Sequence, residues 1–405
     1  MKMVADETKK IKYEYTRLVV PLGPVHPALK EPIRFIVSTR HEEIVDVHVR
    51  LGHAYRGIEV LAETRNVIQA LYLVERICGI CSHAHTTCFV QAVEEIGKIE
   101  PSRRAVYLRT LIAELERIHS HMLLLGLMAH EIGFDTLFMY TWRKRELVMD
   151  LLEEITGNRV HYGMNTFGGV RSDLTPQLKR KVSNVLDRID EATRYIHEVF
   201  QDKTVEKRLC DVGFLSSDDA RELCVVGPTA RGSGIDVDFR RDDPYAAYGD
   251  LKNDFSVVVR SKGDVFSRME VRIFELYEST NLIRRILDGL PDGPVSSAEK
   301  VLKLVGGLPE GEVISRVEAP RGELIHFVKT DGKGGLKRFK ARTPTLANVV
   351  SLKPMLVGGE IADIPVVIAS IDPCISCADR ITIVDLDREE TSTVDLATLR
   401  RKKRD

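Results

Sequence analysis

The residues best suited to chemistry are two pairs of cysteines, each pair separated by two residues. Cys78 and Cys81 stand in the segment Glu-Arg-Ile-Cys-Gly-Ile-Cys-Ser-His-Ala-His (75–85), and Cys374 and Cys377 in Asp-Pro-Cys-Ile-Ser-Cys-Ala-Asp-Arg (372–380). Two intervening residues let the chain turn around a metal, so that both sulfurs of a pair can bind it. Together the two pairs predict a four-sulfur metal site.

The spacing of the cysteine pairs is compatible with two kinds of metal site, one structural and one redox or catalytic. Structural zinc sites usually keep their cysteine pairs within about 15–20 residues, whereas these pairs lie at opposite ends of the chain. A small zinc module is therefore excluded. Soft thiolates suit nickel and iron as well as zinc, so a redox or catalytic metal is favoured and structural zinc remains the alternative. The other cysteines, Cys88, Cys210 and Cys224, are predicted to be small buried apolar residues.

The composition excludes several classes of function. The net charge is −1, so nothing attracts nucleic acid strongly, and the basic run 400–404 is interpreted as a solvated terminus. The polar start 1–15 is unlike a signal peptide, and no stretch of about 18 apolar residues could span a membrane. The odd count of seven cysteines favours metal or redox chemistry over a disulfide framework. Any role at a membrane would then need partner subunits.

The elements that must position the cysteines are strands at both ends and long helices between them. Apolar residues recur at helical spacing over about 103–128, 136–155, 176–200 and 266–287. Strands are predicted at 18–20, 33–38, 44–49, 323–328 and 364–371, and an irregular loop at 231–250. The pattern predicts an α+β, mainly α fold, with a central long-helix bundle and small β-sheet pieces from both ends.

The predicted fold is one integrated catalytic unit with three regions. Residues 1–65 form an N-terminal β region with a loop. Residues 66–290 form the helical core with the first cysteine pair, and residues 291–405 form an α/β region with the second pair and a tail.

Both cysteine segments resemble the paired signature of NiFe hydrogenase large subunits. Arg-x-Cys-Gly-x-Cys-x-x-x-His matches Arg76 to His85, and Asp-Pro-Cys-x-x-Cys matches Asp372 to Cys377. Gly-Pro-Val-His-Pro (23–27), Tyr-Arg-Gly-Ile-Glu (55–59), Glu-Arg-Ile-His-Ser-His (116–121), Gly-Pro-Thr-Ala-Arg-Gly-Ser-Gly (227–234) and Glu-Ala-Pro-Arg-Gly-Glu-Leu (318–324) look most like the energy-converting, membrane-bound (group 4) branch. That branch is related to the quinone-site subunit of respiratory complex I, which lacks the metal-binding cysteines. The resemblance covers almost the whole chain.

The resemblance implies a role for each cysteine. Cys81 and Cys377 would bridge nickel and iron, and Cys78 and Cys374 would be terminal nickel ligands. The iron would carry carbon monoxide and cyanide, which the polypeptide does not supply. Dihydrogen would be split heterolytically, and its proton would go to Cys374.

The resemblance also implies roles around the metals. Glu31 would relay the proton, although a surface glutamate is the alternative; His26 on the same loop either joins the relay or orders the loop. Arg321 and Thr345 would hydrogen-bond the cyanide ligands, unless Arg321 only pairs with Glu318 or Glu323. His85 would orient the site.

Four further residues receive no metal role from the sequence. His119 and His121 are interpreted as satisfied core histidines. Arg56 and Glu59 either pair to hold the sheet against the helices, or Glu59 faces a cluster in a partner.

The resulting hypothesis is the catalytic subunit of a multi-subunit, ion-translocating hydrogenase. No cysteine set for an iron–sulfur cluster is left over, so electrons would pass to a small subunit with a 4Fe–4S cluster. Maturation factors and membrane ion-translocating subunits are further expected partners, placing the chain peripherally on the cytoplasmic face of the cell membrane. The alternatives are a complex I-like reductase module acting on sulfane sulfur or quinone, and a non-catalytic scaffold with structural zinc. The tail after Arg380, a branch-typical arginine, is expected to be retained.

Overall fold

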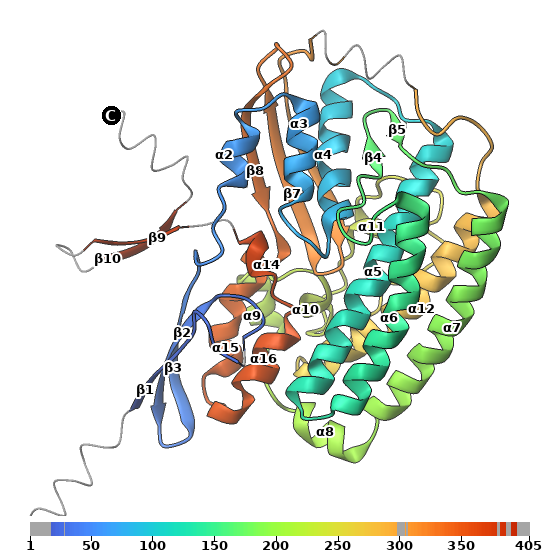
Figure 1. Ribbon diagram of the computed structural model, residues 1–405. Helices are drawn as coiled ribbons and strands as arrows, with labels where there is room; N and C mark the ends of the chain where they lie inside the picture. Colours follow the sequence, from blue (N-terminus) through green and yellow to red (C-terminus); the bar gives the residue numbers. More distant parts are fainter. Residues whose placement is uncertain are drawn as a thin grey trace, which may run out of the picture.

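The computed structural model describes residues 18–27, 29–297, 304, 307–378, 381–385 and 390–394. Within these residues the chain is mainly helical with small antiparallel sheets, which confirms the predicted α+β class. Figure 1 shows a bundle of long helices beside a sheet that is covered by helices from the N-terminal part of the chain. In the same described ranges, none of the helices has both the length and the apolar character needed to cross a bilayer.

The bundle is built from α5 (Arg103–Glu131), α6 (Asp135–Thr156), α7 (Pro176–Phe200) and α12 (Val265–Gly289), which confirms the four predicted long helices. Side-chain oxygens of Ser102, Thr175 and Asp264 accept hydrogen bonds from N–H groups in the first turns of α5, α7 and α12. Such caps satisfy donors that a helix cannot satisfy itself. Gly157, in the left-handed conformation, ends α6.

A three-stranded antiparallel sheet comes from the N-terminal part of the chain, as predicted. Its strands are β1 (Leu18–Leu22), β2 (Arg34–Arg40) and β3 (Glu43–Arg50), in the order β1-β2-β3. Phe35 and Val37 are fully buried on alternate positions of β2 and anchor this sheet to the bundle core. The connection between β1 and β2 contains Glu31 and is therefore held at both ends by paired strands.

A second antiparallel sheet comes from the C-terminal part of the chain. It consists of β6 (Glu312–Ala319), β7 (Gly322–Thr330) and β8 (Leu336–Arg342), and β7 confirms the strand predicted at 323–328. Helix α4 (Ser82–Gly97) packs against β6 and β7, helix α2 (Ile58–Ala62) packs against β8, and helix α3 (Val67–Glu75) packs against α2 and α4 (Figure 1). Their shared apolar cluster includes all four paired cysteines. Packing of N-terminal helices on a C-terminal sheet thus brings the two cysteine pairs together.

Short elements complete the described structure. These are α8 (Lys203–Leu209), α9 (Ser217–Glu222), α10 (Gly227–Arg231), α11 (Phe239–Asp242), α14 (Pro344–Asn348), η1 (Val349–Ser351), α15 (Leu352–Leu356), η2 (Ile361–Asp363), α16 (Ile364–Ser370), η3 (Ile375–Cys377), β4 (Asn165–Thr166), β5 (Gly169–Val170), β9 (Ile381–Asp385) and β10 (Glu390–Val394). Arg380 and the end of the tail, 395–405, lie outside the described residues.

The strand predicted at 364–371 was wrong, because this segment forms helix α16. Short apolar runs suit a buried strand and a buried helix equally well. Pro365 stands in the first turn of α16, where its missing N–H costs nothing. Contacts with α5 and α12 then bury the apolar side chains as a helix.

The irregular loop predicted at 231–250 was only partly correct, because α11 interrupts it. Three of its charged residues are buried, namely Arg231, Asp238 and Arg240. Arg231 Nη2 lies 2.7 Å from Glu275 Oε1 on α12, and its Nη1 lies 2.8 Å from Glu318 Oε1 on β6. The segment therefore supplies buried cations that join the bundle to the C-terminal sheet.

Two glycines meet where α10 approaches the β6–β7 turn. Gly227 has a φ of 67°, and a Cβ atom there would lie 2.3 Å from Gly322 Cα and 2.5 Å from Arg321 O. Real Cβ atoms do not come so close to backbone atoms. The backbone contact therefore requires glycine, and it fixes the segment that carries Arg321.

We expect Gly227→Ala to lower the free energy of unfolding by about 2–5 kcal/mol, since left-handed strain and overpacking add together. Gly157→Ala is the matched control, because Gly157 also has a positive φ, 90°, but no atom lies within 4 Å of its added Cβ. The control should cost only the left-handed strain, about 1–2 kcal/mol. Denaturant unfolding of the purified protein measures both, and equal losses would contradict the steric argument.

Candidate metal centre

The first cysteine pair lies in the turn between α3 and α4. Cys78 Sγ accepts hydrogen bonds from the backbone N–H groups of Ile80 and Cys81, both at 3.3 Å. The N-terminus of α4 has no side-chain cap from its own N-cap residue, Cys81. Glu116 on α5 caps it instead, because its two carboxylate oxygens accept from His83 N at 2.7 Å and Ala84 N at 3.0 Å. The turn is thus anchored to the bundle.

The second cysteine pair lies directly after α16. Asp372 has a positive φ, 52°, a conformation that Asp tolerates better than most residues. Two threonines then hold the pair: Thr345 Oγ1 accepts from Cys374 N at 3.0 Å, and Thr343 Oγ1 donates to Cys377 O at 3.1 Å. Both hydroxyls are buried, so water competes little for these bonds.

Arg56 joins the two segments. Its guanidinium donates to Arg76 O at 2.8 Å and Ile77 O at 2.7 Å, just before the first pair. It also donates to Ser376 O at 2.9 Å, inside the second pair. Glu59, meanwhile, accepts from Lys340 Nζ at 2.7 Å and Ala341 N at 3.0 Å. Arg56 therefore holds the two cysteine segments to each other, and Glu59 holds α2 to β8.

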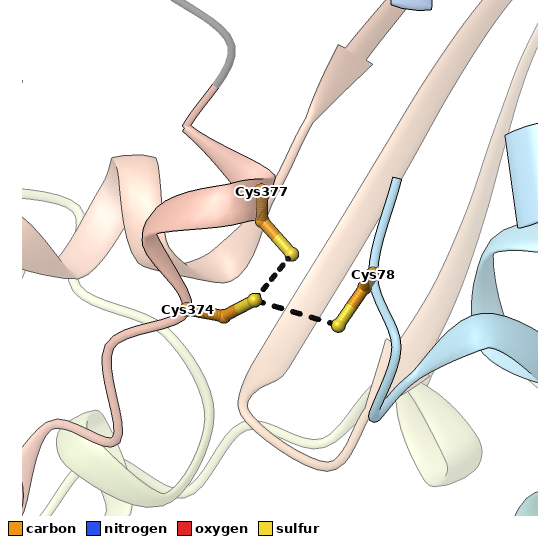
Figure 2. Close-up of side chains that lie close together, drawn as sticks. All are labelled: Cys78, Cys374 and Cys377. Carbon is orange, nitrogen blue, oxygen red and sulfur yellow. Dashed lines mark hydrogen bonds between the residues drawn. The ribbon is translucent and has the colours of Figure 1, made fainter. Parts of the chain in front are cut away.

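The four sulfurs converge in one buried place. Cys78 Sγ lies 3.5 Å from Cys374 Sγ, which lies 3.1 Å from Cys377 Sγ (Figure 2). These three atoms lie within 4.8 Å of one another, as do Cys81 Sγ, Cys377 Sγ and one ring nitrogen of His85. All four cysteines are free thiols, at most 4% exposed. Cys377 belongs to both sets and therefore links them into one donor cluster.

The protonation of the cluster indicates what it can bind. Contacts with Cys374 and Cys377 lower the pKa of Cys78 well below its usual range. The contact with Cys374, in turn, raises the pKa of Cys377 well above it. Thiolates so close together repel one another in a buried site. A cation between them removes that repulsion, so the cluster suits a soft metal.

Arg321 lies beside the sulfurs and is buried. Its Nε donates to Asp372 O and its Nη2 to Asp372 Oδ1, both at 2.8 Å, and its Nη1 donates to Ser120 Oγ at 3.1 Å. Burial opposes its charge, but Asp372 and the neighbouring cysteines raise the pKa of Arg321 well above its usual value. The alternative partners Glu318 and Glu323 were therefore wrong. Those acids pair with Arg231 and Arg342, and the acid that pairs with Arg321 precedes the second cysteine pair.

Glu31 reaches the second pair from the N-terminal loop. Its Oε2 accepts from Ser376 N at 2.7 Å. Burial raises the pKa of Glu31, although the bond from Ser376 opposes this shift. Its position is not that of an ordinary surface glutamate. A cavity of about 330 Å³ adjoins it, with a mostly apolar lining that includes Ile80, Arg321 and Pro373.

The described contacts place the remaining candidates as follows. His85 Nε2 lies 4.0 Å from Cys377 Sγ. His119 and His121 are buried and have partners: His119 Nε2 lies 3.0 Å from Ile80 O, and His121 Nε2 lies 2.7 Å from Glu275 Oε2. His26 is half-buried on the Glu31 loop, and its role stays a prediction.

The prediction for the other cysteines holds only in part. Cys88 is buried, and burial raises the pKa of its thiol to about 12. Cys210 is half-buried, and Cys224 is exposed, contrary to the prediction. Cys224 lies in the turn after α9, with a positive φ of 53°, and the exposure of a turn residue depends on neighbours that the local sequence does not reveal.

Sequence reasoning missed three residues that shape the site: Glu116, Ser120 and Asp372. Each acts on a residue far away in the chain, so no local spacing reveals it. The available signal was their place in the motifs Glu-Arg-Ile-His-Ser-His (116–121) and Asp-Pro-Cys-x-x-Cys (372–377), which does not reveal their partners.

Comparisons with known proteins agree with this fold and site. Residues 131–380 match the family described as respiratory-chain NADH dehydrogenase, 49 Kd subunit, and residues 56–127 match the nickel-dependent hydrogenase family. A membrane-bound hydrogenase subunit alpha from Pyrococcus furiosus is 45% identical over 93% of this chain and 90% of its own length. A carbon monoxide-induced hydrogenase from Rhodospirillum rubrum is 39% identical over 89% of this chain and 99% of its own.

A solved structure gives the same result for the fold. The membrane-bound sulfane sulfur reductase, an archaeal respiratory membrane complex, contains a chain that matches with a TM-score of 0.86 and 30% identity, over 91% of this chain and 100% of that one. The fold that this chain shares with these relatives is thus that of the 49 kDa-type subunits of respiratory and hydrogenase complexes. The chain belongs to the NiFe hydrogenase large-subunit family, in its energy-converting, complex I-related branch. It is an oxidoreductase chain of the hydrogenase class.

Replacement of Glu116 tests whether α5 positions the first cysteine pair. Glu116→Leu leaves two buried N–H groups without acceptors, so we expect a loss of about 2–4 kcal/mol in unfolding free energy and a lower metal content per chain. Glu116→Gln keeps one acceptor and should lose less. Ser102→Ala removes the cap of α5 away from the cysteines, so it should lower stability by about 1 kcal/mol without lowering the metal content. Full metal content in Glu116→Leu would contradict the positioning role.

Proposed function

We propose that this chain is the catalytic large subunit of a multi-subunit, ion-translocating NiFe hydrogenase. It would interconvert dihydrogen with protons and electrons at a nickel–iron centre on Cys78, Cys81, Cys374 and Cys377. The observation that carries the proposal is the convergence of these four buried free thiols beside the buried Arg321 guanidinium. The hydrogenases among the relatives, aligned over nearly their whole length, support it.

The residues fit such a centre. Four soft donors in a dry pocket suit nickel and iron, and the guanidinium offsets the negative charge of an assembly rich in thiolates. When bound, the centre supplies a Lewis-acidic site at which dihydrogen is polarised and split heterolytically. Cys81 and Cys377 are proposed to hold both metals, and Cys78 and Cys374 to hold nickel.

Arg321 and Thr345 are proposed to hold the cyanide ligands of the iron, which would also carry carbon monoxide. Arg321 Nε, Nη1 and Nη2 all have protein partners, so its plane is fixed before any ligand binds. Thr345 Oγ1 accepts from Cys374 N at 3.0 Å, which leaves the hydroxyl hydrogen to donate. Two fixed donors beside the sulfurs support this assignment.

The proton is proposed to leave by way of Glu31. Cys374 Sγ takes it first, as the terminal thiolate of the second pair. Glu31 is tied to that pair through Ser376 N, and burial, which raises its pKa, makes the carboxylate a better proton acceptor. The adjoining cavity runs from Arg321 and Pro373 to the ion pair of Lys30 and Glu131, whose Nζ and Oε1 lie 2.6 Å apart. Its apolar lining also suits entry of dihydrogen.

The electrons are proposed to go to a partner. Among the described residues, the grouped metal-binding side chains all belong to the centre itself. A small subunit with a 4Fe–4S cluster would therefore receive the electrons, and membrane subunits would move ions. The chain would lie on the cytoplasmic face of the cell membrane through these partners, and maturation factors would build the centre.

A reductase of the complex I type is the second candidate, acting on sulfane sulfur or quinone. The fold match to the sulfane sulfur reductase complex favours it. The four converging cysteines favour the hydrogenase, because a reductase of this type would have no need of a four-sulfur metal site. A scaffold with structural zinc is the third candidate, and metal identity separates it from the other two.

Infrared spectroscopy of the intact complex, purified anaerobically from its host, tests the function. We expect bands from carbon monoxide and cyanide, together with nickel and iron near one each per chain by elemental analysis. Cys78→Ser should abolish the bands, because a hydroxyl is a poor donor for a soft metal, whereas Cys224→Ser, at an exposed cysteine, should leave them unchanged. Zinc alone, with no such bands, would favour the scaffold, and a metal-free active reductase would favour the second candidate.

Glu31→Gln tests the proton route. The amide cannot accept the proton, so we expect hydrogen evolution to fall by about 10²–10⁴-fold while the infrared bands and metal content persist. Glu42→Gln, at an exposed position of the β2–β3 turn, is the matched control and should retain full turnover. Turnover in Glu31→Gln equal to that of the control would remove Glu31 from the route.

A further inference from the structure

A second histidine lies directly behind His85. His85 Nδ1 is 3.1 Å from His326 Nε2, and both rings are buried. The other ring nitrogen of His85, Nε2, lies 4.0 Å from Cys377 Sγ. A continuous line of contacts therefore runs from His326 through His85 to a sulfur of the metal centre.

The position of His326 is fixed by its surroundings. It lies in the middle of β7, opposite Ser315 on β6 and Ala341 on β8. Its ring meets Phe339 edge to face, with centroids 5.1 Å apart. His326 Nδ1 is buried and has no hydrogen-bond partner among the described residues. The ring thus has one polar contact, which is the one to His85.

These contacts decide where the hydrogens lie. Two facing nitrogens 3.1 Å apart share one hydrogen, so one donates and the other accepts. If His85 Nδ1 donates, the hydrogen of His326 must lie on its Nδ1, and this buried N–H has no acceptor. The same unpaired N–H arises whenever His326 Nδ1 is protonated, including when a ring carries hydrogens on both nitrogens. Buried unpaired N–H groups are rarer and more costly than bare acceptors. The arrangement without such a group has the hydrogen of His326 on Nε2, donated to His85 Nδ1.

We propose that His326 is a positioning residue that keeps the hydrogen of His85 on Nε2, directed at Cys377 Sγ. In this arrangement His85 Nδ1 accepts from His326, so its remaining nitrogen carries the hydrogen and donates to the sulfur. The inference rests on the proposed function in one respect, namely that Cys377 is a metal ligand. It assigns to His326 a role that no local sequence pattern suggested.

The consequence concerns the direction of proton movement. A ring nitrogen that already carries its hydrogen cannot accept another from the centre. His85 then serves as a fixed donor to a thiolate, which stabilises its negative charge. The proposed route by way of Cys374 and Glu31, whose carboxylate accepts from Ser376 N, is then not in competition with His85. The His326–His85 pair would therefore prevent the proton from leaving by way of His85.

Nitrogen-15 solid-state spectra of the intact complex, labelled at histidine, test the proton positions. The His85 and His326 signals are assigned by difference from the His85→Gln and His326→Leu variants. We expect both rings to carry hydrogen on Nε2 and none on Nδ1. Hydrogen on Nδ1 of either ring would overturn the proposal, and this readout does not depend on which metal is bound.

Infrared spectra of variants test the effect on the centre. His326→Leu leaves the His85 ring without its donor, so the N–H···S contact weakens and the thiolate becomes more electron-rich. We expect the carbon monoxide band to shift to lower wavenumber and turnover to fall about 10–100-fold, as for other residues that orient metal ligands. His326→Gln keeps an N–H near the same position and should restore both. Phe339→Leu is the matched control, because it removes the ring contacts of Phe339 with His326 and Phe89 but neither partner of the His326–His85 contact.

The outcomes separate the two proposals. Wild-type complex without carbon monoxide or cyanide bands would overturn the hydrogenase assignment, while the nitrogen spectra would still decide the proton positions. If His326→Leu shows wild-type bands while His85→Gln shifts them, His326 does not act through His85. Equal loss of thermal stability in His326→Leu and His326→Gln, with unshifted bands in both, would show a packing role only and would likewise contradict the proposal.

Discussion

The structure depends on one constraint: thiol groups from opposite ends of the chain must meet without a covalent link. Cys78 and Cys374 are 296 residues apart, yet their sulfurs lie 3.5 Å from each other. Buried thiolates repel one another, so the sulfurs contribute no stability to this arrangement unless a cation binds. The protein around them must therefore hold the two segments in place. Arg56 does so directly, because its guanidinium bonds to carbonyl groups of both segments.

The frame around the centre is made of buried ion pairs as well as apolar packing. Arg231 joins Glu275 on α12 to Glu318 on β6, and Arg240 joins Asp238 to Glu114 on α5. Buried pairs add little to stability compared with apolar packing, but they are costly to break. Their arrangement therefore fixes how the bundle and the C-terminal sheet sit on each other. The cysteine segments, Arg321 and His326 are all attached to these two parts, so the geometry of the centre follows from that fixed relation.

The sequence predicted the features that have local causes. Apolar residues at helical spacing predicted the long helices, and the Cys-x-x-Cys spacing identified the metal-binding donors. The strand predicted at 364–371 was wrong because a short apolar run does not distinguish strand from helix until its neighbours are known. Asp372 as the partner of Arg321, Glu116 as the cap of α4 and His326 behind His85 could not be predicted, since each depends on contacts between distant segments. The division into regions 1–65, 66–290 and 291–405 stays an interpretation.

The surroundings of the centre differ between the two cysteines of the second pair. Around Cys377 lie groups that donate or are apolar: Thr343 donates to its carbonyl oxygen, and His85 faces its sulfur. Near Cys374 lie the Glu31 carboxylate and a cavity lined by Pro373 and Arg321. The Glu31 carboxylate near Cys374 can accept a proton, whereas His85 donates to the sulfur of Cys377. The two sulfurs therefore differ in proton affinity. Under the proposed function, this difference favours proton exit by way of Cys374 and Glu31 over exit by way of Cys377 and His85.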